Sequence, residues 1–443
     1  MKKAVSILLA LGMILSLAAC SANDPTPSPE APASTPGATT EDAANIVQEA
    51  ENIEIEFWYQ NSNYTTWIEK MAADFHAVHE NITITPVIHG TDEALTAALT
   101  AAFQDNSAPA IFHCRVNASY ASYVDAGLME DLSNYDFASK ISESLKEGAS
   151  MNGILGAAPL GYSAFCVIYN QDIFDELGLT APRNFDEMLN VVNACKDAGY
   201  GGIAYPGGNA GHVWLSRAMW FSTMQAEYKN FEEGIDNGTI TDLTEYPDAM
   251  DAMRSMSAYG ANDLWYNGSD SMAFDAELTL FTNRECAMIV TYTGQMIAQE
   301  ALADMNLGIF PFASLTGNGT YYGEVNNMIG MWSGATDEQK AASALFIDFC
   351  LQDDNLSYYA STLGELVSVD GIVADHKYGE LFAKEMVDPG ITMRALAVDH
   401  NTEYWKAELD AMLLDFTFNG ADVDSNVETY SQHLKDADIA SIA

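Results

Sequence analysis

A regular alternation of extended and helical segments near the start of the chain limits what it can fold into. Residues 53–58 alternate β-branched and aromatic side chains with charged ones, residues 82–87 repeat a similar pattern, and residues 110–114 form a short apolar run. Between these segments, large apolar residues recur every three or four positions, as on the buried face of a helix. This alternation predicts an α/β fold with a mostly parallel sheet and helices on both faces.

The ends of the predicted strands are the natural place for a ligand. In an open α/β sheet, ligands bind beyond the carboxyl ends of the strands. Residues 59–65 and 115–120 follow the first and third predicted strands and contain polar and aromatic side chains. We therefore expect these two segments to border a binding site.

The first 20 residues have the features of a secretory leader. Two lysines precede an apolar run over residues 4–17, which is shorter than the about 20 residues that cross a membrane. The run ends in Leu-Ala-Ala-Cys, and a cysteine directly after small residues is typical of a lipobox. We predict a signal peptide over residues 1–19 and lipidation of Cys20. The alternative is an ordinary signal peptide with an incidental cysteine.

A proline-rich segment follows this cysteine. Five prolines alternate with Ser, Thr and Ala between residues 25 and 36, and proline at this density excludes helix and central strand. We expect residues 20–49 to form a solvated tether that holds a folded body away from the membrane. The remaining chain is longer than one ordinary domain, so two lobes are expected.

Charge restricts the partners. The chain has 18 Lys and Arg against 63 Asp and Glu, which gives a net charge of −45, and the leader would remove two of the lysines. Attraction to nucleic acid or to an anionic membrane surface needs clustered basic residues, so both are disfavoured. The acidity suits a soluble exported protein. It also leaves open a cationic solute, such as a polyamine, as the ligand.

The cysteine and histidine positions do not form a metal or disulfide pattern. Beyond Cys20 the number of cysteines is odd, and none has Cys-x-x-Cys spacing. We interpret these five residues, most of them in apolar runs, as buried free thiols: Cys114, Cys166, Cys195, Cys286 and Cys350. Residues 422–428 only faintly resemble a calcium loop, and an exposed acidic turn is the alternative. We expect no metal and no cofactor.

Catalytic signatures are absent from the sequence. It contains no Gly-x-Ser-x-Gly, no His-Glu-x-x-His and no phosphate-binding glycine loop. Because acidic residues are so numerous, counting them does not eliminate a glycosidase-like carboxylate pair. We expect a protein that is not an enzyme, and keep a surface glycan-active enzyme as the weaker alternative.

Seven short motifs stand in an order found in one known family. In chain order they lie at residues 101–103, 109–112, 127–132, 153–182, 287–290, 307–311 and 338–349. Their sequence and spacing resemble the family 1 extracellular solute-binding proteins, which include the maltose-binding proteins. The likeness runs from about residue 53 to residue 435.

The resemblance implies a two-lobed, periplasmic-binding-protein-like fold with hinge strands and an interlobe cleft that closes around a solute. By this likeness the first lobe comprises residues 50–160 and 310–350, and the second comprises residues 161–309 and 351–443. It implies a monomeric lipoprotein on the extracytoplasmic face of the cell membrane, held there only by its N-terminal lipid, such as palmitate. Its expected role is to deliver a small neutral carbohydrate, an oligosaccharide, to the permease subunits of an ABC importer.

A carbohydrate site needs both aromatic and polar side chains. Sugar rings present apolar C–H faces and a rim of hydroxyl groups, so aromatics cover the faces and a few polar groups bind the rim. Residues of both kinds occur at the predicted strand ends and in the loops. The candidate ligand-binding residues are Trp58, Tyr59, Asn61, Arg115, Tyr162, Trp214, Tyr292 and Trp405.

Four of these candidates have a structural alternative. Trp58 and Tyr162 fit a core position equally well, and Arg115 has many acidic residues with which to pair. Trp405 shares a helical stripe with Leu409 and Met412, which is typical of a core.

Tyr292 marks a departure from the family. After the strand that ends near residue 290, many of the sugar binders carry Gly-x-Trp, whose Trp stacks on the ligand. This chain has Thr-Tyr-Thr-Gly-Gln over residues 291–295, so Tyr292 would have to replace that Trp. The size of the sugar therefore stays open.

Overall fold

A computed structural model describes most of the chain beyond its N-terminal segment. The described residues are 40–49, 52–60, 62–208, 212–224, 231–294, 296, 302, 305–317, 319–373, 375–387, 392–393 and 402–441. They belong to a unit that extends from Gly37 to Ala443. The predicted signal peptide, Cys20 and the proline-rich segment lie outside the described residues.

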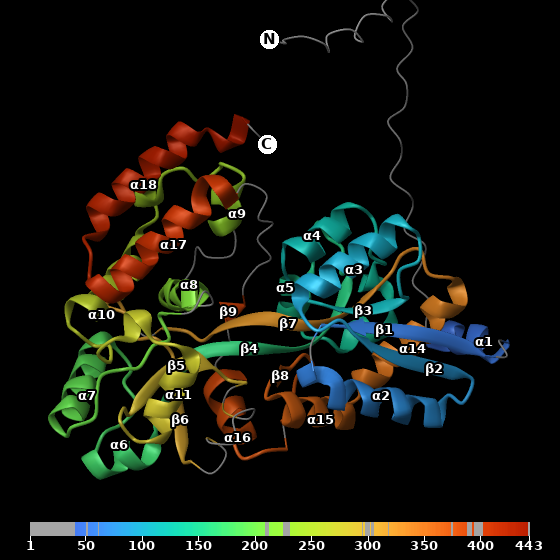
Figure 1. Ribbon diagram of the computed structural model, residues 1–443, viewed down its shortest axis with the longest axis horizontal. Helices are drawn as coiled ribbons and strands as arrows, with labels where there is room; N and C mark the ends of the chain where they lie inside the picture. The colour runs from blue at the N-terminus through green and yellow to red at the C-terminus, as the bar shows by residue number, and fades with distance from the viewer. Residues whose placement is uncertain are drawn as a thin grey trace, which may run out of the picture. The chain divides into compact units, whose positions relative to one another are not determined.

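Three parallel strands begin the sheet. β1 (Ile53–Tyr59) pairs in parallel with β2 (Ile82–Ile88) on one side and with β3 (Ile111–Cys114) on the other. The connections are α2 (Thr65–Val78) and α3 (Asp92–Gln104). Figure 1 shows these two helices on opposite faces of the strands. The β-α-β-α-β prediction is confirmed.

Two long strands extend this sheet in antiparallel fashion. β7 (Tyr322–Met331) pairs with β3, and β4 (Ala157–Asn170) pairs along most of the length of β7, as Figure 1 also shows. The strand order is β2-β1-β3-β7-β4-β5, with β5 (Met288–Tyr292) and β6 (Leu307–Phe310) both antiparallel to β4. The sheet is therefore mixed rather than mostly parallel, because the chain returns to it through β7.

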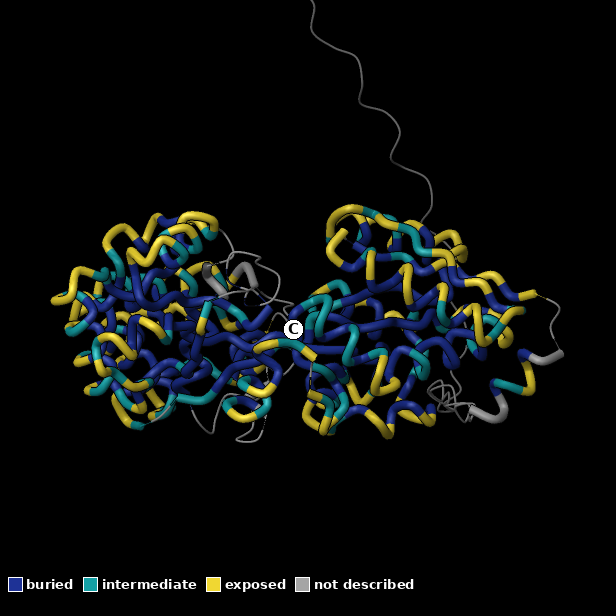
Figure 2. The backbone as a smooth tube through the Cα atoms, turned by 90° about the horizontal axis from the view of Figure 1, so that it is seen from below, coloured by how far each residue is buried: buried dark blue, intermediate teal, exposed yellow. Residues whose placement is uncertain are grey.

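β4 contributes to two hydrophobic cores. All 14 of its residues are buried, and Figure 2 shows buried segments enclosed by exposed ones. Cys166 and Ile168 pack in the first core, whereas Val167 and Tyr169 pack in the second. Since successive side chains of a strand point to opposite faces, one continuous apolar run serves both cores.

Separate sets of helices cover the two cores. Those with residues in the first core, besides α2 and α3, are α1 (Thr40–Glu49), α4 (Ala118–Asp125), α5 (Glu143–Ala149), α14 (Asp337–Cys350), α15 (Asp353–Leu363) and α16 (Gly379–Phe382). Those with residues in the second core are α6 (Gln171–Leu177), α7 (Phe185–Asp197), α8 (His212–Thr223), α9 (Phe231–Asp236), α10 (Pro247–Ala261), α17 (Thr402–Asn419) and α18 (Val423–Ala437). α11 (Phe274–Thr282) contacts both. The short strands β8 (Leu366–Val367) and β9 (Thr392–Met393) pair with β4 and β7.

Two boundaries differ from the sequence analysis. Residues 351–386 pack in the first core, although we assigned everything from 351 onward to the second lobe. The Tyr359 ring lies edge-on to Trp67 of α2, with ring centroids 5.3 Å apart. The expected tether is also too long, because Ala43 and Val47 of α1 are buried in the first core.

Short polar motifs begin several helices. Thr336 and Gln339 form a capping box at the start of α14. Asn184 caps α7 by accepting from the Glu187 backbone, and the Glu187 side chain accepts from the Arg183 backbone. Asp422, in the segment that resembles a calcium loop, accepts from the Ser425 backbone at 2.8 Å and caps α18.

Buried free thiols occur in both cores. The five cysteines beyond Cys20 are free and buried, as predicted. Of the helices in the described part of the chain, none is both long and apolar enough to cross a bilayer.

We predict that Gly161→Ala lowers the free energy of unfolding by about 1–3 kcal/mol, as expected for overpacking. A Cβ atom at this position would lie 2.6 Å from both the Leu366 carbonyl oxygen and the Tyr359 ring. Gly317→Ala is the control, since no described atom lies within 4 Å of its Cβ position. Denaturant unfolding of both variants measures the difference, and equal stability would contradict this packing of β4 against β8.

Candidate functional site

Four polar side chains meet at the carboxyl ends of β1 and β3. Arg115 follows β3, and its Nη1 lies 3.3 Å from Oδ2 of Asp92, at the start of α3. The Gln60 side-chain amide is oriented so that both its oxygen and its nitrogen have hydrogen-bond partners. The oxygen accepts from Nε and Nη2 of Arg115 at 2.9 and 2.7 Å, and the nitrogen donates to Asp92. Tyr64 completes the group through a hydrogen bond with Arg115. We call Gln60, Tyr64, Asp92 and Arg115 the strand-end cluster.

Part of this cluster is open to solvent. The side chains of Arg115 and Asp92 are 36% and 39% exposed, whereas Gln60 is buried. Burial raises the pKa of Asp92, and the neighbouring Arg115 opposes that effect. The cluster thus offers a solute both a guanidinium donor and a carboxylate acceptor, held side by side by Gln60.

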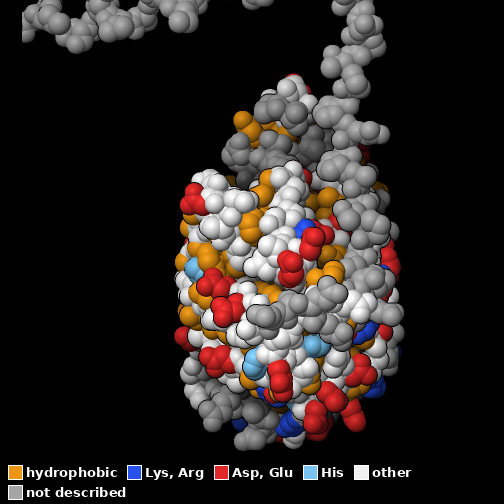
Figure 3. All heavy atoms as spheres, turned by 90° about the vertical axis from the view of Figure 1, so that its right-hand side faces the viewer, with side chains coloured by type: hydrophobic (Ala, Val, Ile, Leu, Met, Phe, Trp, Pro, Cys, Tyr) orange, Lys and Arg blue, Asp and Glu red, His pale blue; other side chains and the backbone are white. Residues whose placement is uncertain are grey.

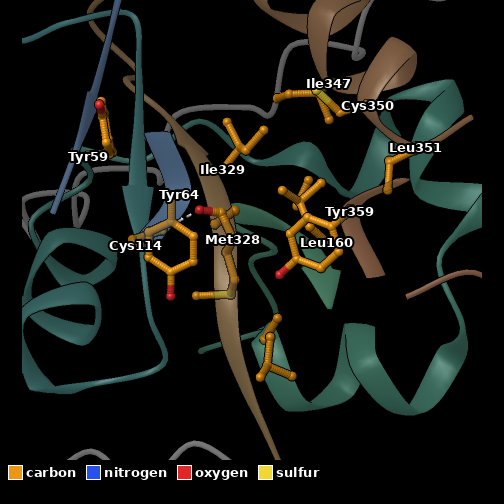
Figure 4. Close-up of a cluster of buried hydrophobic side chains, with 14 of the residues drawn as sticks. Tyr59, Tyr64, Cys114, Leu160, Met328, Ile329, Ile347, Cys350, Leu351 and Tyr359 are labelled. Carbon is orange, nitrogen blue, oxygen red and sulfur yellow. Dashed lines mark hydrogen bonds between the residues drawn. The ribbon is translucent and has the colours of Figure 1, made fainter. Parts of the chain in front are cut away.

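A buried series of contacts, which we call the inner chain, connects Tyr64 of the cluster with His113, Asn327, Glu365 and Tyr359. The Tyr64 ring stacks on His113 of β3, with centroids 4.9 Å apart and planes at 27°. His113 Nε2 hydrogen-bonds to Oδ1 of Asn327 at 2.7 Å. The Asn327 amide nitrogen and the Tyr359 hydroxyl both donate to the Glu365 carboxylate. Figure 4 shows Tyr64 and Tyr359 on either side of Met328, the neighbour of Asn327 in β7.

Burial controls the protonation of this inner chain. Burial lowers the pKa of His113 to about 3, and this effect outweighs the opposing effect of the hydrogen bond that His113 donates to Asn327. It raises the pKa of Glu365, against the hydrogen bonds from Tyr359 and Asn327. It also raises the pKa of Tyr64 to about 12, with Glu365 adding to the effect and Arg115 opposing it. His113 is therefore neutral at physiological pH, and its Nε2 carries the proton because Asn327 Oδ1 only accepts.

Trp58 provides an aromatic surface on the same face of β1 as Gln60. Side chains two residues apart in a strand point the same way. Trp58 is half-buried, its ring lies 4.6 Å from that of His89, and its Nε1 donates to Glu56 at 2.7 Å. Of the predicted site residues, Arg115 belongs to the strand-end cluster, and Trp58 lies near the end of β1.

Tyr59 and Trp405 lie in the cores rather than in a pocket, contrary to our expectation. Tyr59 is 3% exposed, and its hydroxyl hydrogen-bonds to Thr65, because it alternates with Trp58 and so faces inward. Trp405 is 1% exposed in the second core, where its Nε1 donates to Asp236 at 2.8 Å. Trp405 therefore belongs to the helical core stripe with Leu409 and Met412, which was its structural alternative.

Of the other four candidates, the two whose side chains are described lie outside the strand-end cluster. Tyr162 is buried and lines a separate cavity. Tyr292 ends β5, half-buried and edge-on to Phe165. Asn61 lies outside the described residues, and so does the side chain of Trp214, whose backbone is part of α8.

Sequence reasoning missed most of the polar partners of Arg115. Gln60 and Tyr64 lie in a segment that we expected to border the site, but their roles had no separate signal. Asp92 looked like an ordinary acidic residue in the first turn of a helix. Asn327 and Glu365 come from distant parts of the chain, and no local pattern connects them with β3.

Comparison with known proteins identifies the family. Residues 70–383 match the bacterial extracellular solute-binding protein family, and the chain belongs to it. A binding protein of Brucella abortus is 25% identical over 244 residues, which cover 52% of this chain and 56% of that relative, little more than half its length. The sn-glycerol-3-phosphate-binding periplasmic protein UgpB of Agrobacterium fabrum is 21% identical, with 68% of this chain and 70% of that protein covered.

The fold has close counterparts among solved structures. The apo form of RafE from Streptococcus pneumoniae superposes with a TM-score of 0.73 at 17% identity, and covers 88% of this chain and 99% of that one. RafE in complex with raffinose gives 0.64 over the same share of this chain. These neighbours are two-lobed solute-binding proteins, so the predicted α/β, two-lobed fold class is confirmed.

We predict that the His113→Gln variant loses less of its free energy of unfolding than the parent protein does as the pH falls below neutrality. The folded pKa of about 3 lies below the ordinary 6.5, so the unfolded state binds more protons between these values, and stability falls as pH drops through that window. The slope from one such group reaches about 1.4 kcal/mol per pH unit. Denaturant unfolding at pH 4.5 to 7 should show this loss in the parent protein and less of it in the variant.

His433→Gln is the matched control, because His433 is 54% exposed. Glu365 has a raised pKa, so its contribution to the pH dependence of stability has the opposite sign. Because the parent and both variants contain Glu365, the difference between their curves reports His113. Parallel curves for the parent and for His113→Gln would show that His113 is not held neutral by burial.

Proposed function

We propose that this protein captures a neutral oligosaccharide outside the cytoplasm and delivers it to the permease subunits of an ABC importer. The observation that carries this proposal is the strand-end cluster of a chain that belongs to a solute-binding family. Arg115 and Asp92 are partly exposed and hydrogen-bonded through Gln60, and half-buried Trp58 precedes Gln60 by two residues. A hydroxyl can donate to one member of such a pair and accept from the other, while an aromatic face covers apolar C–H groups.

The balance of charge in the cluster favours a neutral solute. Arg115 and Asp92 cancel each other, so an anion would have to compete with Asp92 and a cation with Arg115. Figure 3 shows acidic side chains spread over one face of the protein with sparse basic ones. This dispersed acidity supports a role in solubility rather than one focused cation site. The known binding of raffinose by RafE is consistent with a carbohydrate ligand.

The location follows from the leader. A lipid on Cys20 would hold the protein on the extracytoplasmic face of the membrane, and the proline-rich segment would link that lipid to α1. The two cores would then act as two lobes that close around the solute, with β4 and β7 crossing between them.

Calorimetric titration tests the ligand class. We expect binding of at least one member of a panel of raffinose, maltose and chitooligosaccharides, with a Kd that changes little between low and high salt, since no net charge is screened. Spermidine binding that fades with salt, without a response to any sugar, would favour a polyamine receptor instead. Chromatography of the incubated sugars checks for turnover, which would indicate a glycan-active enzyme.

We predict that Arg115→Ala weakens binding of the responding sugar about ten- to a hundredfold, because hydrogen bonds to a charged group contribute about 1.5–3 kcal/mol. Arg183→Ala is the matched control, since Arg183 is 77% exposed and pairs with Glu187 at the surface. Thermal unfolding of both variants separates lost affinity from lost stability. Unchanged affinity in Arg115→Ala would remove the strand-end cluster from the site.

We predict that Cys20→Ala abolishes lipid attachment, so that the protein either appears in the medium or stays unprocessed. Phase partitioning with a nonionic detergent measures this, and the parent protein should enter the detergent phase. Ser21→Ala, one residue later, serves as the control and should behave like the parent. A Cys20→Ala protein that still partitions into detergent would contradict the lipoprotein assignment.

A further inference from the structure

A cavity lies apart from the strand-end cluster. Its volume is about 260 Å³, and it is bounded by α5, by β8 with the turn that follows, and by α16. None of the four cluster residues lines it, and Glu365 is its one link to the inner chain. On β4, Tyr162 lines this cavity, whereas the next residue, Ser163, hydrogen-bonds to Asn326.

The cavity is compact. Its volume of about 260 Å³ lies just below the about 300–1,000 Å³ of typical small-molecule pockets, so it suits a small ligand better than a long oligosaccharide.

The walls are mostly apolar, with aromatic rings and carboxylates. Leu145, Leu366 and Phe382 are buried in the first core, while Asp370 and Val373 are exposed and mark the mouth. No lysine, arginine or histidine is among the described residues that line the cavity. The wall therefore suits an apolar body that carries a positive charge, and disfavours an anion.

The Tyr162 side chain contributes a hydroxyl to this wall. Tyr162 is 8% exposed and lines the cavity, and a phenol hydroxyl can both donate and accept a hydrogen bond. The carboxylate of Glu365 is already bound by Tyr359 and Asn327. Asp370 lies close enough to add to the effect of burial in raising the pKa of Tyr162.

We propose that this cavity is a second ligand site, which binds a small organic ammonium compound. Asp370 at the mouth and the rings of Tyr162 and Phe382 attract the cation, the aliphatic wall holds its methyl or methylene groups, and the Tyr162 hydroxyl bonds to a polar substituent. Aromatic faces together with a carboxylate are the groups that recognise alkylammonium ions. The site goes beyond the proposed sugar transport and needs no sugar for its occupation.

Calorimetry with choline and its neutral isostere, 3,3-dimethylbutan-1-ol, tests the proposal. The two probes have the same shape and hydroxyl, so their difference reports the charge alone. We expect one-to-one binding of choline, about fivefold or more tighter than that of the isostere. Absence of choline binding to the folded protein, or equal affinity for both probes, would overturn the proposal.

Substitutions of lining residues test whether choline binds in this cavity. Asp370→Asn should weaken choline about threefold or more and leave the isostere unchanged, whereas Glu80→Gln, an exposed acid elsewhere, should change neither. Tyr162→Phe should weaken both probes several-fold, because both lose the hydrogen bond to the phenol hydroxyl. Ala383→Met, which fills the cavity from the half-buried residue that follows α16, should abolish binding of both. Choline affinity that is indifferent to Asp370→Asn and Ala383→Met places the binding elsewhere and refutes the site.

A competition experiment separates this site from the proposed sugar site. Choline should bind equally well to Arg115→Ala, and equally well with a saturating sugar present. If the protein binds choline but no sugar, the transport proposal is refuted and the choline site is not affected. Displacement of choline by the sugar would mean that both share the strand-end cluster, and the second site would be wrong.

Discussion

The pairing of β4 with β7 is the constraint on which the rest of the structure depends. These strands run antiparallel through the middle of the sheet, and every residue of β4 is buried. Because its alternate side chains enter different cores, β4 fixes both at once. Gly161 allows Leu366 and Tyr359 to approach this strand closely, and Tyr359 brings Glu365 to Asn327. The sheet thereby positions the inner chain that supports the strand-end cluster.

The strand-end cluster shows how a protein with so few basic residues holds one of them in a fixed orientation. Arg115 is held by Asp92 and Gln60, so its guanidinium would be oriented before the proposed solute arrives. An ion pair at a half-exposed position adds little to stability, and its value lies in the placement of donors and acceptors. Below it, the neutral His113 lets Tyr64 stack without introducing a buried charge.

Much of the fold was predictable because its signals are local. The alternation at residues 53–58 is the alternation of buried and exposed residues in β1, and Thr336 with Gln339 marks the start of α14. The site was less predictable. Arg115 stood out because a base directly follows an apolar strand, whereas Tyr59 faces the core because it alternates with Trp58 along β1. For Trp405, helical spacing indicated the core position that the structure shows.

The sequence by itself determined the strands and helices of the first lobe, the burial of the free cysteines and the family order of the motifs, because these depend on side-chain periods of two and 3.6 residues and on short turns. Only the tertiary structure decided that the sheet is mixed, that residues 351–386 join the first core, and that Arg115 meets Gln60 and Asp92. It also decided that His113 reaches Asn327 and Glu365. Such contacts join residues far apart in the chain, and their geometry exists only once the strands have paired.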